Sequence, residues 1–160
     1  MAWTNISNGT KPDADEVMGN FDLVRYRIFD STTSATSTQS TTEATLTTLS
    51  VGAGECTTLV KIDIDYDCVS FVTGGGDSTI GRLHIYIGET GSTVLKKTFK
   101  PFGNVQSGTG GQFQGTYIYT YLPTSDEKTN GFDIEIKGQV ANSGTTGGDA
   151  GYNSVYVYGI

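Results

Sequence analysis

The sequence contains a single histidine, His84, so any mechanism that activates a nucleophile through an imidazole must use this residue. His84 lies between Leu83 and Ile85 in an alternating run, on the side opposite the apolar residues. No Gly-x-Ser-x-Gly segment surrounds any serine. We therefore expect His84 to be a surface or interface residue and the chain not to be an enzyme, with a small hydrolase as the weaker alternative.

Three aspartates, Asp63, Asp65 and Asp67, project from one face of a predicted strand, with neighbours about 7 Å apart. Their repulsion must be offset by water, by a lysine or arginine on a neighbouring strand, or by a cation such as calcium. The segment lacks the glycine and the closing glutamate of an EF-hand loop, and no carboxylate pair stands out for glycoside hydrolysis. We expect a solvated strand face without a metal, and a calcium site remains the alternative.

Tyrosines recur on one side of two predicted strands. They are Tyr117, Tyr119 and Tyr121 in the first strand, and Tyr152, Tyr156 and Tyr158 in the last. Exposed rows of this kind stack on sugar rings or anchor a protein contact. In the alternative arrangement each ring covers the core and its hydroxyl reaches the rim. The candidate ligand or interface residues are Tyr117, Tyr119, Tyr121 and Tyr156.

Cys56 and Cys68 are the only cysteines, and no histidine at ligand spacing accompanies them. Two cysteines are too few for a zinc site, so we expect two buried thiols, or a disulfide if they face each other across neighbouring strands. The glycine-rich segments 74–76, 103–111 and 144–151 lack a lysine in the spacing of a phosphate-binding loop. No cofactor is therefore expected.

The formal net charge is −7, and the Lys and Arg residues are scattered, which argues against nucleic acid as a partner. No apolar run is long enough to cross a bilayer, and the N-terminus lacks the pattern of a signal peptide. We expect synthesis in a cytoplasm and no membrane insertion. The length of 160 residues suits one domain with a small N-terminal appendage.

The elements that position these side chains read as strands separated by turn residues. The predicted strands are 23–29, 57–67, 82–87, 92–99, 116–122, 132–137 and 152–158, with 69–73 as a continuation of the second or a further strand, and with loops at 103–114 and 142–151. Residues 88–91 form a tight turn that joins the strands before and after it into a hairpin. The pattern predicts an all-β antiparallel sandwich or jelly roll of about eight strands with a short N-terminal helix.

Residues 31–50 are overwhelmingly Ser and Thr until Leu46 and Leu49. We expect an extended linker that becomes a strand near Thr45, either as a mobile surface loop or as a strand between subunits. The predicted organisation is an attachment segment at 1–30, this linker at 31–50 and a β-sandwich at 51–160.

Residues 13–24 carry the one short helical signal, which opens with acidic residues suited to a helix N-terminus. An apolar stripe follows at three- and four-residue spacing: Val17, Met18, Phe21 and Val24. So short a helix must dock on something to be stable. It either caps this protein's own core or anchors the chain to a partner.

Trp3 and the following segment DADEVMGNF resemble the start of many tailed-bacteriophage virion proteins, especially fibre-like and other appendage proteins. The residues that carry the resemblance are Trp3, Asp13, Ala14, Asp15, Val17, Asn20 and Phe21. The resemblance covers about the first 24 residues. One departure is that a fibre protein usually continues into a long shaft.

The resemblance implies a structural protein of the virion, made in the host cytoplasm and displayed as a tail-fibre or appendage head or as a capsid decoration. It implies attachment to other virion proteins through Trp3, Val17, Met18 and Phe21, assembly as a homotrimer, and contact with a host surface glycan as a further option. The alternative interpretation is a carbohydrate-binding β-sandwich that recognises a cell-surface glycan.

Overall fold

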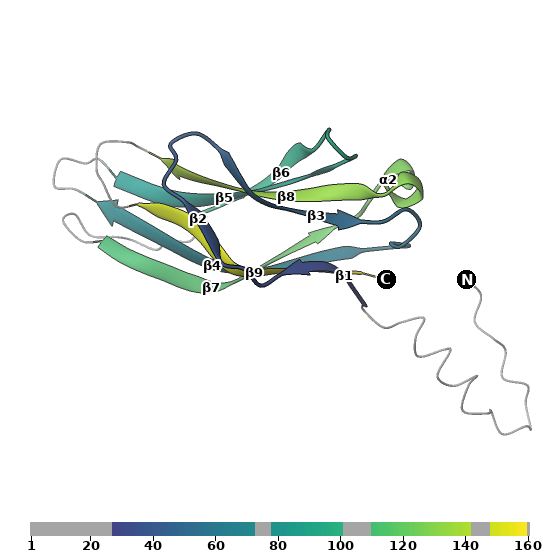
Figure 1. The fold of residues 1–160 in the computed structure, drawn as a ribbon, viewed down its shortest axis with the longest axis horizontal. Coiled ribbons are helices and arrows are strands. Elements are labelled where there is room, and N and C mark those ends of the chain that lie inside the picture. Colours follow the sequence, from purple (N-terminus) through teal and green to yellow (C-terminus); the bar gives the residue numbers. More distant parts are fainter. Residues whose placement is uncertain (1–26, 73–77, 101–109, 142–147, 160) are drawn as a thin grey trace, which may run out of the picture.

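The computed structural model describes residues 27–72, 78–100, 110–141 and 148–159. Within these residues the chain forms nine strands and one short helix, arranged as a two-layered sandwich (Figure 1). The elements are β1 (Arg27–Thr32), β2 (Thr36–Thr38), β3 (Ala44–Val51), β4 (Val60–Val72), β5 (Ser78–Gly88), β6 (Val94–Phe99), β7 (Gly110–Tyr121), α2 (Ser125–Asn130), β8 (Phe132–Ala141) and β9 (Asp149–Gly159).

The strands form two antiparallel sheets, which we call the β4 sheet and the β5 sheet. In the β4 sheet, β9 and β4 are central, β7 is one edge, and β1 and β2 together form the other edge. In the β5 sheet, β8 and β5 are central, and β3 and β6 are the edges. The ends of β4 and β5 pair over two residues and join the sheets. Figure 1 shows the β4 sheet below and the β5 sheet above.

From β2 to β9, every connection crosses from one sheet to the other, except the hairpin between β5 and β6. Two antiparallel sheets wound from one chain in this order form a jelly roll. β1 and β2 act as one interrupted strand, because both pair with β9. The predicted all-β antiparallel sandwich or jelly roll is confirmed. The predicted N-terminal helix and its residues Trp3, Val17, Met18 and Phe21 lie outside the described residues.

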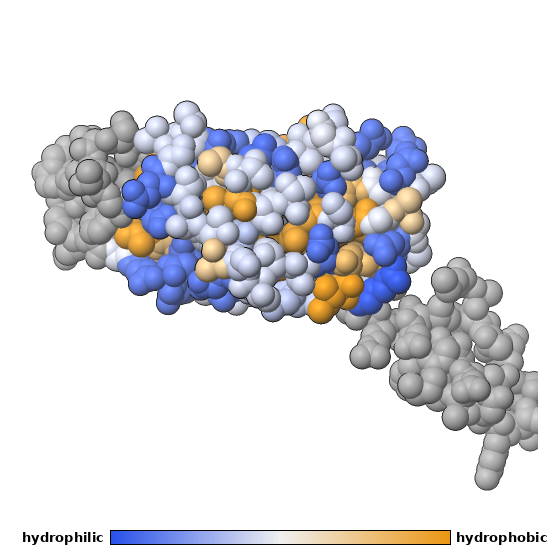
Figure 2. Space-filling model, viewed as in Figure 1, coloured by the Kyte–Doolittle hydropathy of each residue, from blue (hydrophilic) through white to orange (hydrophobic). Residues whose placement is uncertain are grey.

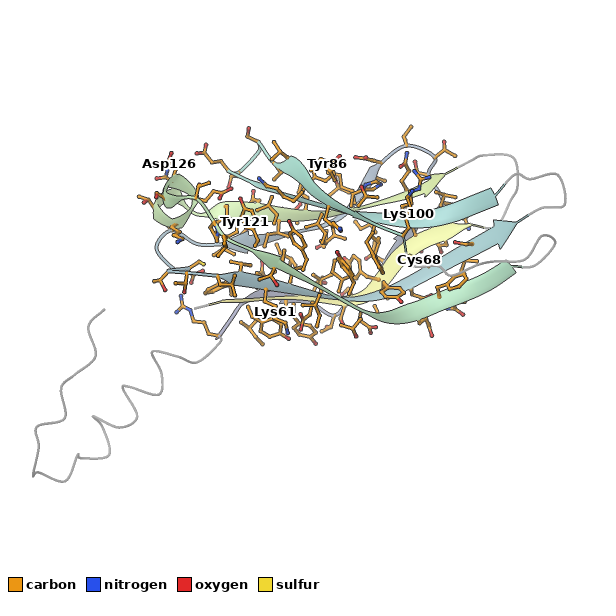
Figure 3. All side chains as sticks on the ribbon, turned by 180° about the vertical axis from the view of Figure 1, so that it is seen from behind. Lys61, Cys68, Tyr86, Lys100, Tyr121 and Asp126 are labelled. Carbon is orange, nitrogen blue, oxygen red and sulfur yellow. The ribbon has the colours of Figure 1, made fainter. Side chains whose placement is uncertain are left out.

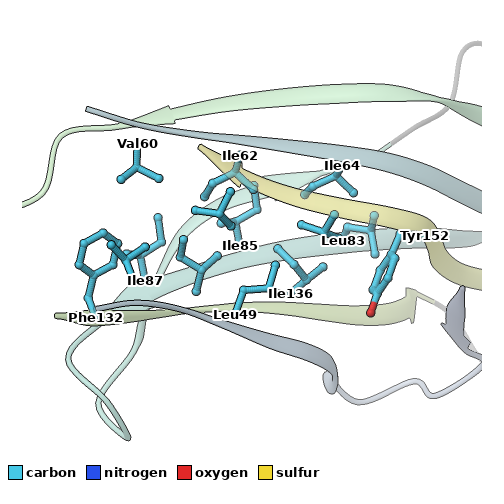
Figure 4. Packing of buried hydrophobic residues seen from close by; sticks show 14 of the residues in the cluster. Leu49, Val60, Ile62, Ile64, Leu83, Ile85, Ile87, Phe132, Ile136 and Tyr152 are labelled. Carbon is cyan, nitrogen blue, oxygen red and sulfur yellow. The ribbon is translucent and has the colours of Figure 1, made fainter. Parts of the chain in front are cut away.

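The core lies between the two sheets, because alternate residues of the central strands point inward. Figure 4 shows Ile62 and Ile64 of β4 facing Leu83 and Ile85 of β5. These residues have no exposed surface. The two-residue periods predicted for β4, β5 and β8 therefore correspond to the buried faces of the sandwich.

The glycine at position 81 permits a close approach of β5 to β9. A Cβ atom on Gly81 would lie 2.1 Å from the carbonyl oxygen of Asp149, closer than any side chain can approach. Only glycine therefore fits where these strands begin.

The helix α2 was not predicted, although the sequence carries its signature at Thr124 and Glu127. The Thr124 hydroxyl accepts a hydrogen bond from the Glu127 amide at 3.2 Å, and the Glu127 carboxylate accepts one from the Thr124 amide at 2.7 Å. This reciprocal pair is a capping box. The Tyr121 hydroxyl donates to both oxygens of the same buried carboxylate, at 2.9 and 3.0 Å. Glu127 thus fixes α2 to the end of β7.

The Ser/Thr-rich residues 31–50 differ from the predicted linker, because they supply the end of β1, all of β2 and most of β3. Threonine suits such half-buried edge positions, since its branched side chain favours extended backbone. The strand expected near Thr45 is present, and the sandwich begins at β1 instead of at residue 51.

Strand β7 begins at Gly110 and β9 at Asp149, earlier than the predicted starts at 116 and 152. Both extensions pair with β4, which continues through residues 69–72. Pairing with this long central strand holds glycine-rich sequence in the sheet, which local propensity did not indicate.

The surface carries small hydrophobic groups separated by neutral and hydrophilic residues on the face shown in Figure 2. Among the residues that the structure describes, the large apolar residues that are exposed are Ile28, Val94, Leu95, Ile118 and Leu122. Among the described residues, no helix has the length and apolar character needed to cross a membrane.

Candidate functional site

The outer face of the β4 sheet carries the predicted aspartate row. The Lys61 ammonium lies 3.0 Å from the Asp63 carboxylate. Gln112 and Gln114 of β7 donate hydrogen bonds of 2.8 to 2.9 Å to the Asp67 carboxylate. In the described part of the chain, no group of three or more His, Cys, Asp or Glu residues could hold a metal ion. Lysine and amide donors thus contact the Asp63 and Asp67 carboxylates, and the calcium alternative stays a prediction.

A hollow of about 210 Å³ opens on the same face, over β4 and β9 and between β2 and β7. Its polar lining includes Ser37 of β2, Asp67, Gln112, Asp149 and Asn153. The Asp149 Oδ1 atom is buried and accepts no hydrogen bond from the described residues. Carboxylate, amide and hydroxyl groups in one hollow can both donate and accept hydrogen bonds, as a ligand rich in hydroxyl groups requires.

The sequence could not reveal this hollow, because its lining comes from four strands that lie far apart along the chain. Asp67 was recognised only as a member of the aspartate row. Asn153 lies at the irregularity where β9 passes β4, between the paired residues Tyr152 and Ser154. No local spacing predicts that bulge.

Three of the four candidate tyrosines, Tyr117, Tyr119 and Tyr121, pack against the core and do not form an exposed row. The Tyr117 ring stacks on Phe99 of β6, with ring centroids 4.1 Å apart. Ile118, which points the other way, is 53% exposed. The structure therefore favours the alternative in which these rings cover the core.

Tyr156 lies on the outer face of the β4 sheet and is the candidate tyrosine available there. Its ring stacks on Tyr158, with centroids 6.0 Å apart. The Lys61 ammonium lies 5.5 Å from the centre of the Tyr158 ring. Asp63 is the cross-strand neighbour of Tyr156. Together these residues form a mixed aromatic and charged surface, without a nucleophile.

His84 lies opposite the apolar stripe of β5, as predicted, but it is buried and only 5% exposed. Its Nδ1 atom lies 3.0 Å from the Thr98 hydroxyl and 3.8 Å from the Glu43 carboxylate. Burial lowers the pKa of His84, and the nearby Glu43 carboxylate offsets part of this effect. The expected exposed surface position is wrong, because Thr98 of β6 and Glu43 lie against the ring, and the interface position stays a prediction.

The contacts of His84 do not have the geometry of a catalytic relay. In a triad, the nucleophile and the carboxylate bind opposite nitrogens of the imidazole, so that the proton passes through the ring. Here the Thr98 hydroxyl and the Glu43 carboxylate both lie at Nδ1. This arrangement stabilises the outer face of the β5 sheet and gives no support to the hydrolase alternative.

Cys56 and Cys68 are buried thiols and are not joined as a disulfide, as predicted. The Cys68 thiol donates to the carbonyl oxygen of Gly151 at 3.7 Å. Burial raises the pKa of Cys68 to about 11 and also raises the pKa of Cys56. Both groups are therefore poor nucleophiles at neutral pH.

No protein-family model matches the sequence, and no curated protein matches it. Similar solved structures come from infectious bursal disease virus. The VP2 subviral particle is 17% identical with a TM-score of 0.48, and the alignment covers 85% of this chain and 33% of that one. The virus-derived T=1 particle is 19% identical with a TM-score of 0.46, covering 85% and 32%. This chain thus spans about one third of the length of these proteins.

Proposed function

We propose that this chain is a non-enzymatic structural protein of a virus particle, with a jelly roll displayed outward from an N-terminal attachment segment. The observation that carries the proposal is the combination of the segment Trp3 and DADEVMGNF with a jelly-roll domain directly after it. Jelly rolls serve in viral capsids and in lectins. The absence of a catalytic relay at His84 agrees with a role in assembly.

The proposed particle is that of a tailed bacteriophage, in which the chain forms a fibre or appendage head or decorates the capsid. Residues 1–24 bind another virion protein, with Trp3, Val17, Met18 and Phe21 as the anchoring side chains. Copies associate as a homotrimer. The net charge of −7 keeps such a protein soluble at the high local concentration of a particle surface.

Deleting residues 1–24 should abolish incorporation into particles and leave the sandwich folded. The reason is that β1 to β9 pair among themselves and their inward-facing residues form a core cluster. Incorporation is measured by quantifying the chain in purified particles, and folding by circular dichroism. Changing Trp3, Val17, Met18 and Phe21 together to alanine is the finer variant, and it should have the same effect. Normal incorporation of either variant into particles would contradict the proposal.

A second candidate function, binding of a surface glycan, is favoured by the hollow that contains Asp67 and Asp149. The experiment is a glycan array with the wild-type chain and the variant Asp149→Asn, which removes the charge of the carboxylate whose Oδ1 atom accepts no hydrogen bond from the described residues. Asp65→Asn is the matched control, because Asp65 lies on the same face but outside the lining. We expect the first change to weaken binding about tenfold, as the loss of one charged hydrogen bond implies, and the control to bind normally. Binding to no glycan, or equal effects of both changes, would exclude this role for the hollow.

A further inference from the structure

The hollow on the outer face of the β4 sheet has an acidic lining. Asp67 and Asp149 contribute carboxylates to it, and the described residues that line it include no lysine or arginine. Lys61, a lysine on the same face, precedes Asp67 by six positions, a rise of about 20 Å along β4. Figure 3 shows Lys61 nearer to α2 and Cys68, the next residue after Asp67, further from it. The two carboxylates therefore have no cation beside them in the described lining.

The two carboxylates differ in their hydrogen-bond partners. Asp67 accepts hydrogen bonds of 2.8 to 2.9 Å from the side-chain amides of Gln112 and Gln114, which hold its carboxylate in place without adding a positive charge. The Asp149 Oδ1 atom is buried and accepts no hydrogen bond from the described residues. A carboxylate that is partly removed from water is stabilised by a donor, and most strongly by a charged one. The lining thus suits a ligand that donates hydrogen bonds and carries a positive charge.

The Cys68 thiol, which belongs to the core on the inner side of β4, lies close to both carboxylates. Cys68 follows Asp67 in the chain and pairs with Ala150, the residue after Asp149. Burial is the main cause that raises its pKa to about 11, and the negative charges of Asp149 and Asp67 contribute to the rise. Two negative charges that oppose a third in this way stabilise a positive charge at the same end of the sheet.

Gly151 keeps the space between Asp67 and Ser37 open. It pairs with Asp67 of β4 on one side and with Ser37 of β2 on the other. A Cβ atom on Gly151 would lie 2.5 Å from the Cβ atom of Ser37, so no side chain fits between these two lining residues. The volume of about 210 Å³ equals that of about seven water molecules. This space suits one sugar ring and leaves the rest of a glycan outside.

We propose that the hollow binds the terminal residue of a glycan, and that this residue is an amino sugar with a free, protonated amine. The ammonium group lies against the Asp149 carboxylate, and the ring hydroxyls bond to polar lining groups such as those of Asn153 and Ser37. Sugars with a carboxylate, sulfate or phosphate are rejected, because their charge would face Asp67 and Asp149 without a cation. The inference rests on glycan binding as the second candidate function and names the class of sugar.

The test is a glycan array, probed with the full chain, that carries each amino sugar once with a free amine and once with an N-acetylated amine. The pairs have the gluco, galacto and manno configurations, and the corresponding uronic acids form a third set. N-acetyl-lysine amide supplies an ammonium group without a sugar ring. At least one free-amine sugar should bind about tenfold more tightly than its N-acetylated partner, which is the difference between a charged and a neutral hydrogen bond. The uronic acids should not bind, and the lysine amide should bind about tenfold more weakly than the sugar.

Two further measurements place the ammonium group in the hollow. Asp149→Asn should reduce the preference for the free amine from about tenfold to about twofold or less, whereas the control Asp65→Asn should leave it unchanged. Raising the salt concentration to about 0.5 M should weaken binding of the free-amine sugar to the wild-type chain more than binding of its N-acetylated partner, because salt screens the charge pair. The salt comparison needs no variant and therefore does not depend on how Asp149→Asn folds.

The outcomes separate this inference from glycan binding itself. If an N-acetylated or acidic sugar binds as tightly as the free-amine sugar, and Asp149→Asn weakens that binding, the amino sugar is wrong and glycan binding in the hollow stands. A preference for the free amine that Asp149→Asn and salt leave unchanged would also overturn the inference. Equal binding of the lysine amide and the amino sugar would show that the sugar ring is not recognised. Binding to no sugar would overturn both.

Discussion

Replacing Phe132 by alanine should lower the free energy of unfolding by about 3 to 5 kcal/mol, measured by urea unfolding at neutral pH. Phe132 is 1% exposed and is among the largest side chains that the core buries completely. The Tyr121 ring meets it edge-on, with centroids 6.2 Å apart. Alanine at this position removes the buried ring and leaves a cavity between the two sheets, which the rigid strands cannot close.

Two further variants make this prediction specific. Phe132→Leu keeps most of the apolar volume and should recover more than half of the lost stability. Leu122→Ala removes an equally apolar residue that is 73% exposed, and it should change stability by about 0.5 kcal/mol or less. A loss at Phe132→Ala no larger than that at Leu122→Ala would contradict the packing of this core.

Raising the pH from 9 to 11 should destabilise the wild-type chain by about 2 kcal/mol more than the variant Cys68→Ala. Burial raises the pKa of Cys68 from its ordinary value of 9.0 to about 11 in the folded chain. Between these values the unfolded chain loses the thiol proton and the folded chain keeps it, so ionisation favours unfolding. The stability that the thiol contributes is complete below pH 9 and is lost as the pH rises through about 11.

The comparison with Cys68→Ala isolates this effect. Other groups whose pKa burial or a nearby carboxylate raises, such as Tyr86 and Tyr121, titrate in both chains and cancel in the difference. The measurement is the free energy of unfolding at several pH values from 7 to 11. Parallel curves for the two chains over this range would show that the Cys68 thiol ionises freely in the folded state.

Local alternation in the sequence was sufficient to predict the central strands. Ile62 and Ile64 on β4, and Leu83 and Ile85 on β5, alternate with polar residues, and burial of one face produces that pattern directly. The turn at 88–91 likewise predicted the hairpin of β5 and β6, because glycine-containing turns act locally.

Features that depend on pairing partners distant in sequence were not predictable. Residues 110–114 read as part of a glycine-rich loop, yet they form a strand because β4 extends alongside them. His84 read as a surface or interface residue, but within this chain it is buried against Glu43 and Thr98, which lie 41 positions before and 14 positions after it. In both cases the neighbouring parts of the chain determine the conformation or the burial, and the local sequence does not indicate which neighbours these are.

The candidate sites likewise combine features that the local sequence predicts with features that depend on distant strands. The aspartate row on β4 was visible as a period of two, and its side chains lie half-buried on the outer face of the β4 sheet. The hydrogen bonds from Gln112 and Gln114 to Asp67 were not visible, because both glutamines lie on β7. The hollow with Asp149 requires the β-bulge at Asn153 and the alignment of four strands. A site whose residues come from several strands can be predicted only when the strand topology is known.

We propose above all that the jelly roll itself forms the oligomer and leaves residues 1–24 available to bind another virion protein. The mass in solution of the full chain and of the chain without residues 1–24, both by light scattering, tests it most directly. We expect both forms to contain the same number of copies, which is three for the proposed homotrimer. Each copy of the full chain has a mass of 17.0 kDa. A monomer in both forms, or an oligomer that needs residues 1–24, would contradict it.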